Sequence, residues 1–344
     1  MLFLDALLAA SLLASVWGFF YLRPQSGVSA PVLSETIQAL DEKTAPILDR
    51  NSGADSSSLI RTRVSLDPQD WHEKFADHFT DQIVSTDTSY TSPDLAIQIS
   101  RHSYDTSRLD QTGDGSHKRY GTSVAYVLAD IYVGDITCLQ TAFAQNTYGV
   151  GYSEMLSDMA GRLGAVLAVN GDSYSNNRHR DNGTIIRNGI IYRSKKTDVE
   201  TCVLNWDGTM HIYQPDEIKA SQLIRGGAYQ SWVFGPSLLD ASGKAKTSFR
   251  TWDYIRQSHP RTAIGYYGPG HYCLLVANGR QTGYSRGLFL EEMAQIFEDL
   301  GCSAAYSLDG GHCSFMTMEG QTVNHPYRPE HQVSDGIFIT EALK

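Results

Sequence analysis

Residues 184–192 read Thr-Ile-Ile-Arg-Asn-Gly-Ile-Ile-Tyr, with an apolar run on each side of an Asn-Gly pair. Asn-Gly supplies the positive φ angles of the two-residue type I′ turn that joins antiparallel strands. Residues 202–213 repeat the arrangement around Asp207-Gly208, and Gly268-Pro269-Gly270 and Glu319-Gly320 mark two further bends. This density of hairpin signals predicts a largely antiparallel sheet.

Two helices are expected beside the strands. Residues 95–99 and 124–133 have the composition of strands. A first helix is predicted from Ser153 to about residue 163, and a second over about 288–300, each ended by a glycine. We therefore expect an α+β fold, with an antiparallel or mixed sheet core and a few packed helices, in a single catalytic domain over 91–344.

The N-terminal region differs in composition from the rest. Residues 1–22 are nearly all apolar, and aromatic residues gather at 17–21, which is typical of a membrane interface. The segment predicts a transmembrane anchor, with a cleaved signal peptide as the alternative. Residues 23–90 indicate a linker or stalk and a lead-in. We expect a single-pass protein of the cell membrane with its catalytic domain outside the cytoplasm.

The net charge and the cysteine pattern disfavour several classes of function. The formal net charge is −10, with 38 acidic and 28 basic residues, which disfavours a nucleic-acid binder. No Cys-x-x-Cys pair is present, so a zinc ribbon or thioredoxin-type site is disfavoured. Up to two disulfides can form in an oxidising compartment, and their pairing cannot be deduced. The five cysteines are Cys138, Cys202, Cys273, Cys302 and Cys313.

A weak internal similarity links the two predicted helices. Each is followed by glycine, a short apolar strand and a polar turn. The first unit ends in Asn170-Gly171-Asp172 and the second in Asp309-Gly310-Gly311. Polar residues at the carboxyl ends of buried strands often form binding sites. Both turns are expected to open onto one cleft, unless the two units are unrelated.

The Asp309 turn is the strongest candidate for chemistry. Its two glycines allow close approach of a ligand, and their amides can form an anion-binding nest. A partly desolvated carboxylate has a raised pKa that suits proton transfer. The alternative is an Asx-turn, in which Asp309 bonds its own backbone. Asp172 is a candidate second carboxylate of a glycosidase-like pair, and Asn170 a ligand for a sugar hydroxyl.

Two arginines are candidate phosphate ligands. Arg261 and Arg280 are expected near opposite ends of one hairpin, and guanidinium groups bind phosphate in a bidentate manner. A nucleophilic pair of His312 and Cys313 is disfavoured, because sequence neighbours point apart and no third group orients them. A metal site of His312, Asp309 and Asp172 lacks a diagnostic spacing, so no cofactor is expected.

In order along the chain, the motifs resemble those of the phosphodiester glycosidase family. They are Ala-Val-Asn-Gly-Asp at 168–172, Ile-Arg-Asn-Gly at 186–189, Phe-Gly-Pro at 234–236, Arg-Thr-Ala-Ile-Gly at 261–265, Val-Ala-Asn-Gly-Arg at 276–280 and Leu-Asp-Gly-Gly at 308–311. The resemblance runs from about residue 95 to the C-terminus. It implies hydrolysis of a sugar joined through its anomeric carbon to a phosphodiester, with Asn170, Arg261, Arg280 and Asp309 lining the active site.

The chain departs from the family pattern at two places. Asp172 stands where the family commonly has a second glycine, and His312 and Cys313 replace residues that are often small. The N-terminal anchor and stalk resemble bacterial surface members. The predicted catalytic residues are Asp309, Asp172 and Arg261. The predicted substrate-binding residues are Asn170, Gly171, Thr262, Gly279, Arg280, Gly310, Gly311, His312 and Ser314.

Two other functions fit the same residues. One is a non-catalytic glycan-binding protein in exopolysaccharide or cell-wall assembly. The other is a metal-dependent phosphodiesterase that cuts a P–O bond. The expected partners are a sugar-phosphodiester substrate and, through the N-terminal segment, the membrane.

Overall fold

The computed structural model describes residues 27–31, 33, 60–62, 71–109, 120–174, 182–215 and 217–343. The predicted anchor at 1–22 lies outside these residues, so the structure leaves it a prediction. Within the part of the chain that is described, no helix combines the length and apolar character needed to cross a membrane.

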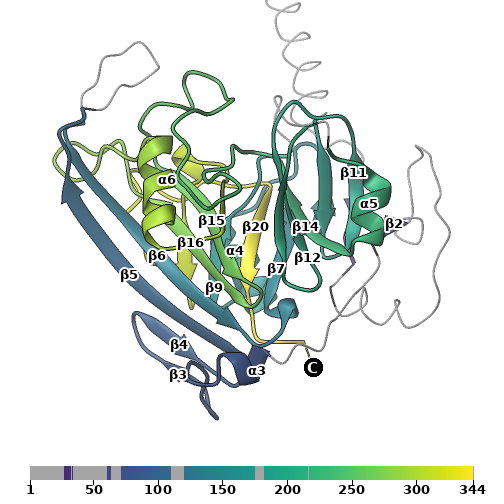
Figure 1. Ribbon diagram of the computed structural model, residues 1–344. Coiled ribbons are helices and arrows are strands. Elements are labelled where there is room, and N and C mark those ends of the chain that lie inside the picture. Colours follow the sequence, from purple (N-terminus) through teal and green to yellow (C-terminus); the bar gives the residue numbers. More distant parts are fainter. Residues whose placement is uncertain are drawn as a thin grey trace, which may run out of the picture.

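A seven-stranded sheet forms the larger half of the fold, with the order β17-β15-β16-β6-β5-β4-β3. Every neighbouring pair is antiparallel. In Figure 1 the long strands β5 and β6 cross the left side of the molecule. The strands are β3 (Val84–Ser85), β4 (Ser89–Thr91), β5 (Leu95–Asp105), β6 (Ser123–Val133), β15 (Arg261–Gly268), β16 (His271–Ala277) and β17 (Ala304–Ser307).

A five-stranded sheet has the order β19-β18-β9-β20-β7, and its neighbours are also antiparallel. Its strands are β7 (Leu139–Phe143), β9 (Leu167–Asn170), β18 (Met316–Met318), β19 (Gln321–Thr322) and β20 (Asp335–Ile339). The expected α+β fold with a largely antiparallel sheet core is thus confirmed.

Three small sheets complete the strand pairing. Their orders are β13-β12-β14, β10-β11-β2 and β1-β8. The strands are β1 (Val28–Ser29), β2 (Ile60–Arg61), β8 (Thr147–Tyr148), β10 (Thr184–Arg187), β11 (Ile190–Ser194), β12 (Thr201–Asn205), β13 (Met210–Tyr213) and β14 (Ala228–Trp232). Strands from before residue 91 therefore pair with strands of the predicted catalytic domain.

The helices are short and lie on the sheets. They are α3 (Trp71–Lys74), α4 (Leu156–Leu163), α5 (Ala220–Arg225) and α6 (Leu290–Asp299), with 3-10 turns η2 (Ile136–Cys138), η3 (Ala144–Asn146) and η4 (Gly311–Cys313). The N-terminal cap of helix α4 lies two residues later than predicted. The Ser153 hydroxyl donates to Gln332 instead of capping the helix, and Met155 takes the cap position.

The predicted turns differ in their backbone conformation. Asn188 and Gly189 have φ angles of 51° and 76°, the positive values that a type I′ turn requires. In the Asp207-Gly208 turn only Gly208 has a positive φ, of 78°. The Asp207 carboxylate accepts a hydrogen bond from the Thr209 N–H at 2.9 Å, which closes that turn. Side-chain capping therefore replaces the expected backbone geometry at the second hairpin.

The main apolar core lies between the sheets. Its buried side chains include Val276 from the seven-stranded sheet, Ile337 from the five-stranded sheet and Leu204 from β12. Leu33 and Trp71 from the lead-in are buried in the same cluster. A second apolar cluster joins α6 to the outer face of the seven-stranded sheet, where Figure 1 shows the helix. The sheets are thereby held in fixed relation, which matters because the candidate site uses both.

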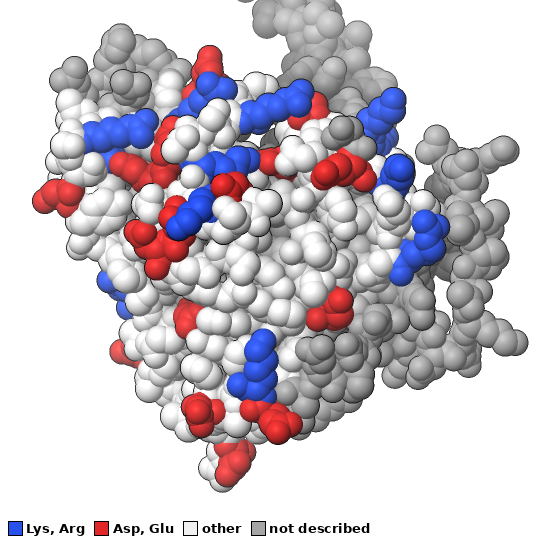
Figure 2. All heavy atoms as spheres, viewed as in Figure 1, with Lys and Arg blue, Asp and Glu red and all other residues white. Residues whose placement is uncertain are grey.

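Two sequence expectations concern charge and disulfides. On the face shown in Figure 2, acidic and basic side chains are interspersed and Lys and Arg do not form a continuous stripe. All five cysteines are free thiols, so neither of the disulfides that the sequence allows is formed. The Sγ atoms of Cys273 and Cys302 lie 3.8 Å apart in the core.

Candidate active site

A cavity of about 440 Å³ opens beside the carboxyl ends of β9 and β17. These strands belong to different sheets, and each is followed by one of the two polar turns singled out in the sequence. The prediction that both turns open onto one cleft is confirmed. The lining residues are Val150, Gly151, Tyr152, Ser153, Asn170, Gly171, Asp172, Ser173, Asp309, Cys313, His331, Gln332, Val333, Ser334 and Asp335.

Asp309 lines this cavity and is partly exposed. Its carboxylate accepts hydrogen bonds from the side chains of Cys313 and Ser173, and from the Gly310 N–H at 2.9 Å. The bond to Gly310 is the local turn contact of the alternative prediction, and it occurs together with exposure to the cavity. Burial raises the pKa of Asp309 to about 6, although the three hydrogen bonds oppose the rise. The carboxylate is therefore oriented, and its pKa suits proton transfer near neutral pH.

The Asn170 side chain links the turn at 170–172 to the turn at 309–311. Its Nδ2 donates to the carbonyl oxygen of Asp309 at 2.7 Å, and its Oδ1 accepts from the Thr262 hydroxyl at 2.6 Å. The Asp309 N–H in turn donates to the carbonyl of Gly171 at 3.1 Å. The Asn170 amide thus positions the Asp309 backbone, and Thr262 orients that amide. Asn170 also lines the cavity, so its predicted contact with substrate stays a prediction, and Thr262 supports it from behind.

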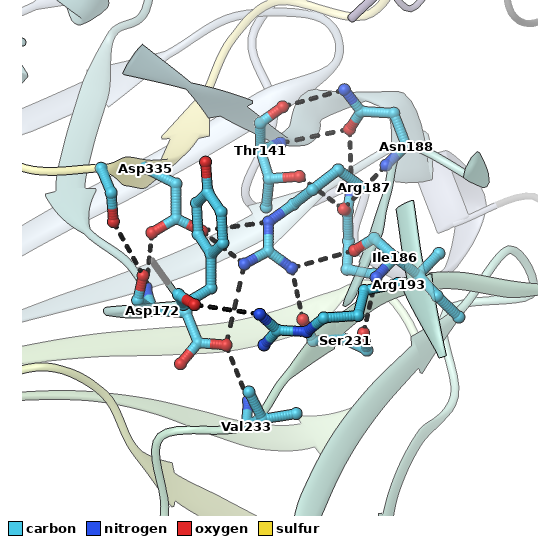
Figure 3. A network of polar contacts seen from close by, with 12 residues as sticks. Thr141, Asp172, Ile186, Arg187, Asn188, Arg193, Ser231, Val233 and Asp335 are labelled. Atoms are coloured by element: carbon cyan, nitrogen blue, oxygen red, sulfur yellow. Dashed lines mark hydrogen bonds and ion pairs between the residues drawn. The ribbon is translucent and has the colours of Figure 1, made fainter. Parts of the chain in front are cut away.

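A buried ion network adjoins the cavity, and Figure 3 shows its polar contacts. The side chains of Asp172, Arg187 and Asp335 are 0%, 2% and 2% exposed, so none reaches solvent. Asp335 accepts from the Asp172 N–H at 2.7 Å and from Nε of Arg187 at 3.1 Å. Burial raises the pKa of Asp335, while the Arg187 charge opposes the shift. Two carboxylates around one guanidinium hold the Asp172 loop against β20.

Asp172 does not fit the role of a second catalytic carboxylate. One carboxylate oxygen accepts from the Val233 N–H at 2.7 Å and lies 3.8 Å from Nη2 of Arg187. The other oxygen is buried without a hydrogen-bond partner. Because the side chain is sealed in the interior, it cannot contact a sugar. Its charge instead contributes to the raised pKa of Asp309, after the larger effect of burial.

Arg280 lies beside the glycine turn. Its Nη1 donates to the Tyr327 hydroxyl at 2.7 Å, and Nη2 is 3.3 Å from Nδ1 of His259. A Cβ atom on Gly311, whose φ is 71°, would lie 3.3 Å from the same Nη2. Burial and the Asp309 charge raise the pKa of the Cys313 thiol, and the Arg280 charge opposes them. Arg280 is therefore within electrostatic reach of the cavity and remains partly exposed.

Comparison with known proteins identifies a family domain in this part of the chain. The family model described as phosphodiester glycosidase matches residues 163–340, more than half of the chain. The chain belongs to the phosphodiester glycosidase family. The matched region contains both polar turns, the two arginines and the buried network. These features are thus part of the family domain.

Similar proteins include one curated relative and two solved structures. The SPbeta prophage-derived uncharacterized protein YomE of Bacillus subtilis (strain 168) is 32% identical over 198 residues, which cover 55% of this chain and 29% of that protein. This chain therefore spans less than a third of that relative. The catalytic domain of zebrafish N-acetylglucosamine-1-phosphodiester alpha-N-acetylglucosaminidase, auto-inhibited by its pro-peptide, has a TM-score of 0.53 and 19% identity, covering 73% of this chain and 89% of that one.

A hypothetical protein from Synechocystis has a TM-score of 0.50 at 14% identity, covering 72% of this chain and 62% of the other. At these identities, the two solved structures establish a shared fold. The assignment to the phosphodiester glycosidase family comes from the sequence match.

Arg261 is the second predicted catalytic residue that the structure places elsewhere. It is 3% exposed and does not line the cavity. Its guanidinium donates to the carbonyls of Leu288, at 3.1 Å, and of Ile255 and Gln257. Burial lowers its pKa to about 9, and the Arg280 charge adds to the effect. Arg261 therefore anchors a backbone loop next to Arg280, because its Nε and Nη2 donate to backbone carbonyls.

The other predicted binding residues divide into two groups. Gly171 lines the cavity, and Gly310 and Gly311 form the turn between Asp309 and Arg280. Gly279, His312 and Ser314 do not line it. Gly279 packs closely on Pro260 and Gly287. The His312 ring bonds the Pro329 carbonyl at 2.9 Å, and Ser314 is 3% exposed.

Three residues that make hydrogen bonds to the site's two turns were not among the predicted site residues. Ser173 and Cys313 bond Asp309, and Asp335 bonds the Asp172 loop. Cys313 stands four residues after Asp309, a spacing that brings side chains together across a helical turn, and this signal was available in the sequence. Asp335 begins β20 with no distinctive local motif. Within the described residues, no group of three or more His, Cys, Asp or Glu side chains is arranged to hold a metal ion.

Proposed function

We propose that the chain hydrolyses the bond between the anomeric carbon of a sugar and a phosphodiester oxygen. Family membership supports a phosphodiester glycosidase reaction. The observation that carries the proposal is Asp309, a hydrogen-bonded carboxylate with a raised pKa at the wall of a cavity of about 440 Å³. Of the three carboxylates among the described lining residues, Asp309 alone is not fully buried.

Asp309 acts in its ionised form in this proposal. With a pKa of about 6, it carries a negative charge above that pH. It then either attacks the anomeric carbon or takes a proton from the attacking water. Hydrogen bonds from Ser173, Cys313 and Gly310 hold the carboxylate in one direction for either step.

Departure of the phosphodiester depends more on stabilisation of its negative charge by a cation than on its protonation. A phosphodiester is anionic, and the phosphate oxygen gains further charge as the glycosidic bond breaks. Arg280, next to the Gly310-Gly311 turn, is the guanidinium that we assign to stabilise that charge. This explains how the site could function without a second exposed carboxylate.

The bond that breaks can be identified by hydrolysis in oxygen-18 water. The substrates are hexose and N-acetylhexosamine 1-phosphodiesters with a small alcohol as aglycone. Cleavage at carbon places the label on the anomeric hydroxyl of the free sugar, which we expect. Label in the phosphate would instead indicate P–O cleavage, as in a phosphodiesterase.

The Asp309→Asn variant provides the matched control. We expect this variant to release no sugar and to remain folded, as its unfolding transition will show. Turnover equal to that of the parent would remove Asp309 from the mechanism. Binding of the substrates without turnover by the parent protein would support the glycan-binding alternative.

We also propose that residues 1–22 keep the domain at the membrane outside the cytoplasm. The support is the apolar run and its terminal aromatic residues. Fractionation of the full chain and of a chain lacking residues 1–22 tests this. Equal amounts of both chains in the membrane fraction would exclude the anchor.

A further inference from the structure

A second cavity, of about 220 Å³, lies outside the site described above. Its walls come from β5, β6, the turn after β16 and the segment after β19. The side chains that matter here are Arg101, His102, Tyr126, Asn278, Tyr284 and His325.

Aromatic rings form two of its walls. The rings of His102 and Tyr126 stack with centroids 4.7 Å apart and planes 10° from parallel. Tyr284 and His325 meet edge to face at 4.9 Å, and Tyr284 is 41% exposed. Such rings present an apolar face and a polar tip, a combination that fits the C–H face and hydroxyls of a sugar ring.

The cavity also offers hydrogen-bond donors and a positive charge. Arg101 is exposed, and within the described residues its guanidinium makes no ion pair or hydrogen bond. The Tyr284 hydroxyl accepts from Asn278 at 3.4 Å and keeps its own proton to donate. A guanidinium with unused donors recognises phosphate or carboxylate in a bidentate manner. The cavity therefore fits a sugar unit that carries an anionic group.

The second cavity is adjacent to Arg280. Asn278 in its wall is two residues before Arg280, and the His325 carbonyl accepts from Gln281 at 2.8 Å. On the same side, Asn324 donates to the carbonyl of Ser314 at 3.1 Å, next to Cys313 of the first cavity. The segment from 278 to 281 therefore contains both Arg280 and a wall residue of the second cavity.

We propose that the second cavity binds the next anionic sugar unit of a sugar-phosphate polymer. The scissile sugar occupies the first cavity, its phosphodiester lies at Arg280, and the following unit reaches the aromatic walls and Arg101. The inference rests on the proposed function and names its substrate class. With a net charge of −10, the chain does not attract a polyanion at long range, so local guanidiniums must provide the recognition.

Comparison of a small and an extended substrate tests the proposal. The small one is the methyl phosphodiester of a sugar 1-phosphate, and the extended one is a trimer of the same sugar joined through 1-phosphodiester bonds. For Arg101→Ala we expect kcat/KM to fall about tenfold on the trimer, through KM, and to stay unchanged on the methyl compound. Arg225→Ala, which removes an exposed arginine from α5, should change neither.

Two outcomes would overturn the inference. One is an equal loss on both substrates, and the other is full activity of Arg101→Ala on the trimer. Arg101→Lys should recover part of the loss, because it restores the charge but not the bidentate geometry.

Calorimetric binding to Asp309→Asn protein separates this inference from the proposed reaction. The trimer should bind more tightly than an uncharged trisaccharide of the same sugar, and Arg101→Ala should abolish the difference. Equal binding of both ligands would overturn the anionic specificity. If the protein hydrolyses no sugar 1-phosphodiester but still shows Arg101-dependent binding, the proposed reaction is wrong and the proposed binding site is supported.

Discussion

The thiol of Cys313 donates a hydrogen bond to the carboxylate of Asp309, four residues earlier in the chain. The 3-10 turn η4 brings the two side chains together. Hydrogen bonds to the ionised form lower the pKa of a carboxylic acid, so this contact opposes the effect of burial. A single neighbouring side chain thus moderates the proton affinity of the candidate catalytic group.

Removing this thiol should shift the pH dependence of activity. In Cys313→Ala the pKa of Asp309 rises further above 6, and the acidic limb of kcat/KM moves to higher pH. A hydrogen bond contributes about 1 kcal/mol, which is about 0.7 pKa unit, so we expect kcat/KM at pH 6 to fall about threefold. Cys313→Ser retains a donor and should resemble the parent. A limb that stays in place in the alanine variant would contradict the assignment.

The raised pKa of Asp309 should also reduce stability at neutral pH. The folded-state pKa of about 6 exceeds the ordinary value of 3.8, so the folded protein binds this proton more tightly than the unfolded chain does. The cost is absent below pH 4 and complete above pH 6. Asp309→Asn should therefore be more stable than the parent at pH 7 by about 1–2 kcal/mol, after allowance for partial exposure.

Denaturant unfolding at pH 4 and pH 7 measures this difference. The two proteins should have similar stabilities at pH 4 and should diverge as the pH rises. A parent that is as stable as Asp309→Asn at pH 7 would argue against a desolvated carboxylate.

Alanine substitutions at two glycines distinguish the effect of backbone strain from the effect of displacing the Arg280 side chain. Gly311 and Gly320 have φ angles of 71° and 76°, so alanine at either position costs about 1 kcal/mol of stability. Only at Gly311 does the added methyl meet a neighbour, Nη2 of Arg280 at 3.3 Å. Gly311→Ala should therefore lower kcat/KM, whereas Gly320→Ala should not. Equal kinetics of the two variants would show that Arg280 tolerates the shift.

The two arginines should respond differently to removal. Arg280→Ala removes the cation assigned to the leaving phosphate, and we expect kcat/KM to fall about 100-fold with little change in unfolding. Arg261→Ala removes the hydrogen bonds to the carbonyls of Leu288, Ile255 and Gln257 and should destabilise the fold by about 2–4 kcal/mol. Steady-state kinetics and denaturant unfolding of both variants test the division. A stable, inactive Arg261→Ala would return that residue to the catalytic set.

Local signals in the sequence predicted much of the architecture. Asn188-Gly189 adopts the expected left-handed pair, and the apolar spacing in α6 places Leu290, Met293 and Phe297 in the core. The two glycine-ended helices and the strands after them bring Asp309 to the same cavity as Gly171. These features depend on neighbours within a few residues, so a single sequence contains them.

Burial of charged side chains could not be predicted in the same way. Asp172 and Arg261 have the residue types of a catalytic site, yet both side chains are buried. The partner of Asp172 through Arg187 is Asp335, which is 163 residues further along the chain. Which donors a carboxylate meets depends on how separate sheets pack, and no local pattern encodes that packing.

The bond from the Asp309 N–H to the Gly171 carbonyl crosses from one sheet to the other. Its two ends therefore move independently if the sheets slide past each other, even while every strand keeps its own partners. A displacement of roughly 1 Å is enough to break a hydrogen bond of ordinary length. Where mild denaturant loosens the packing between the sheets, catalysis should consequently be lost before the strands separate.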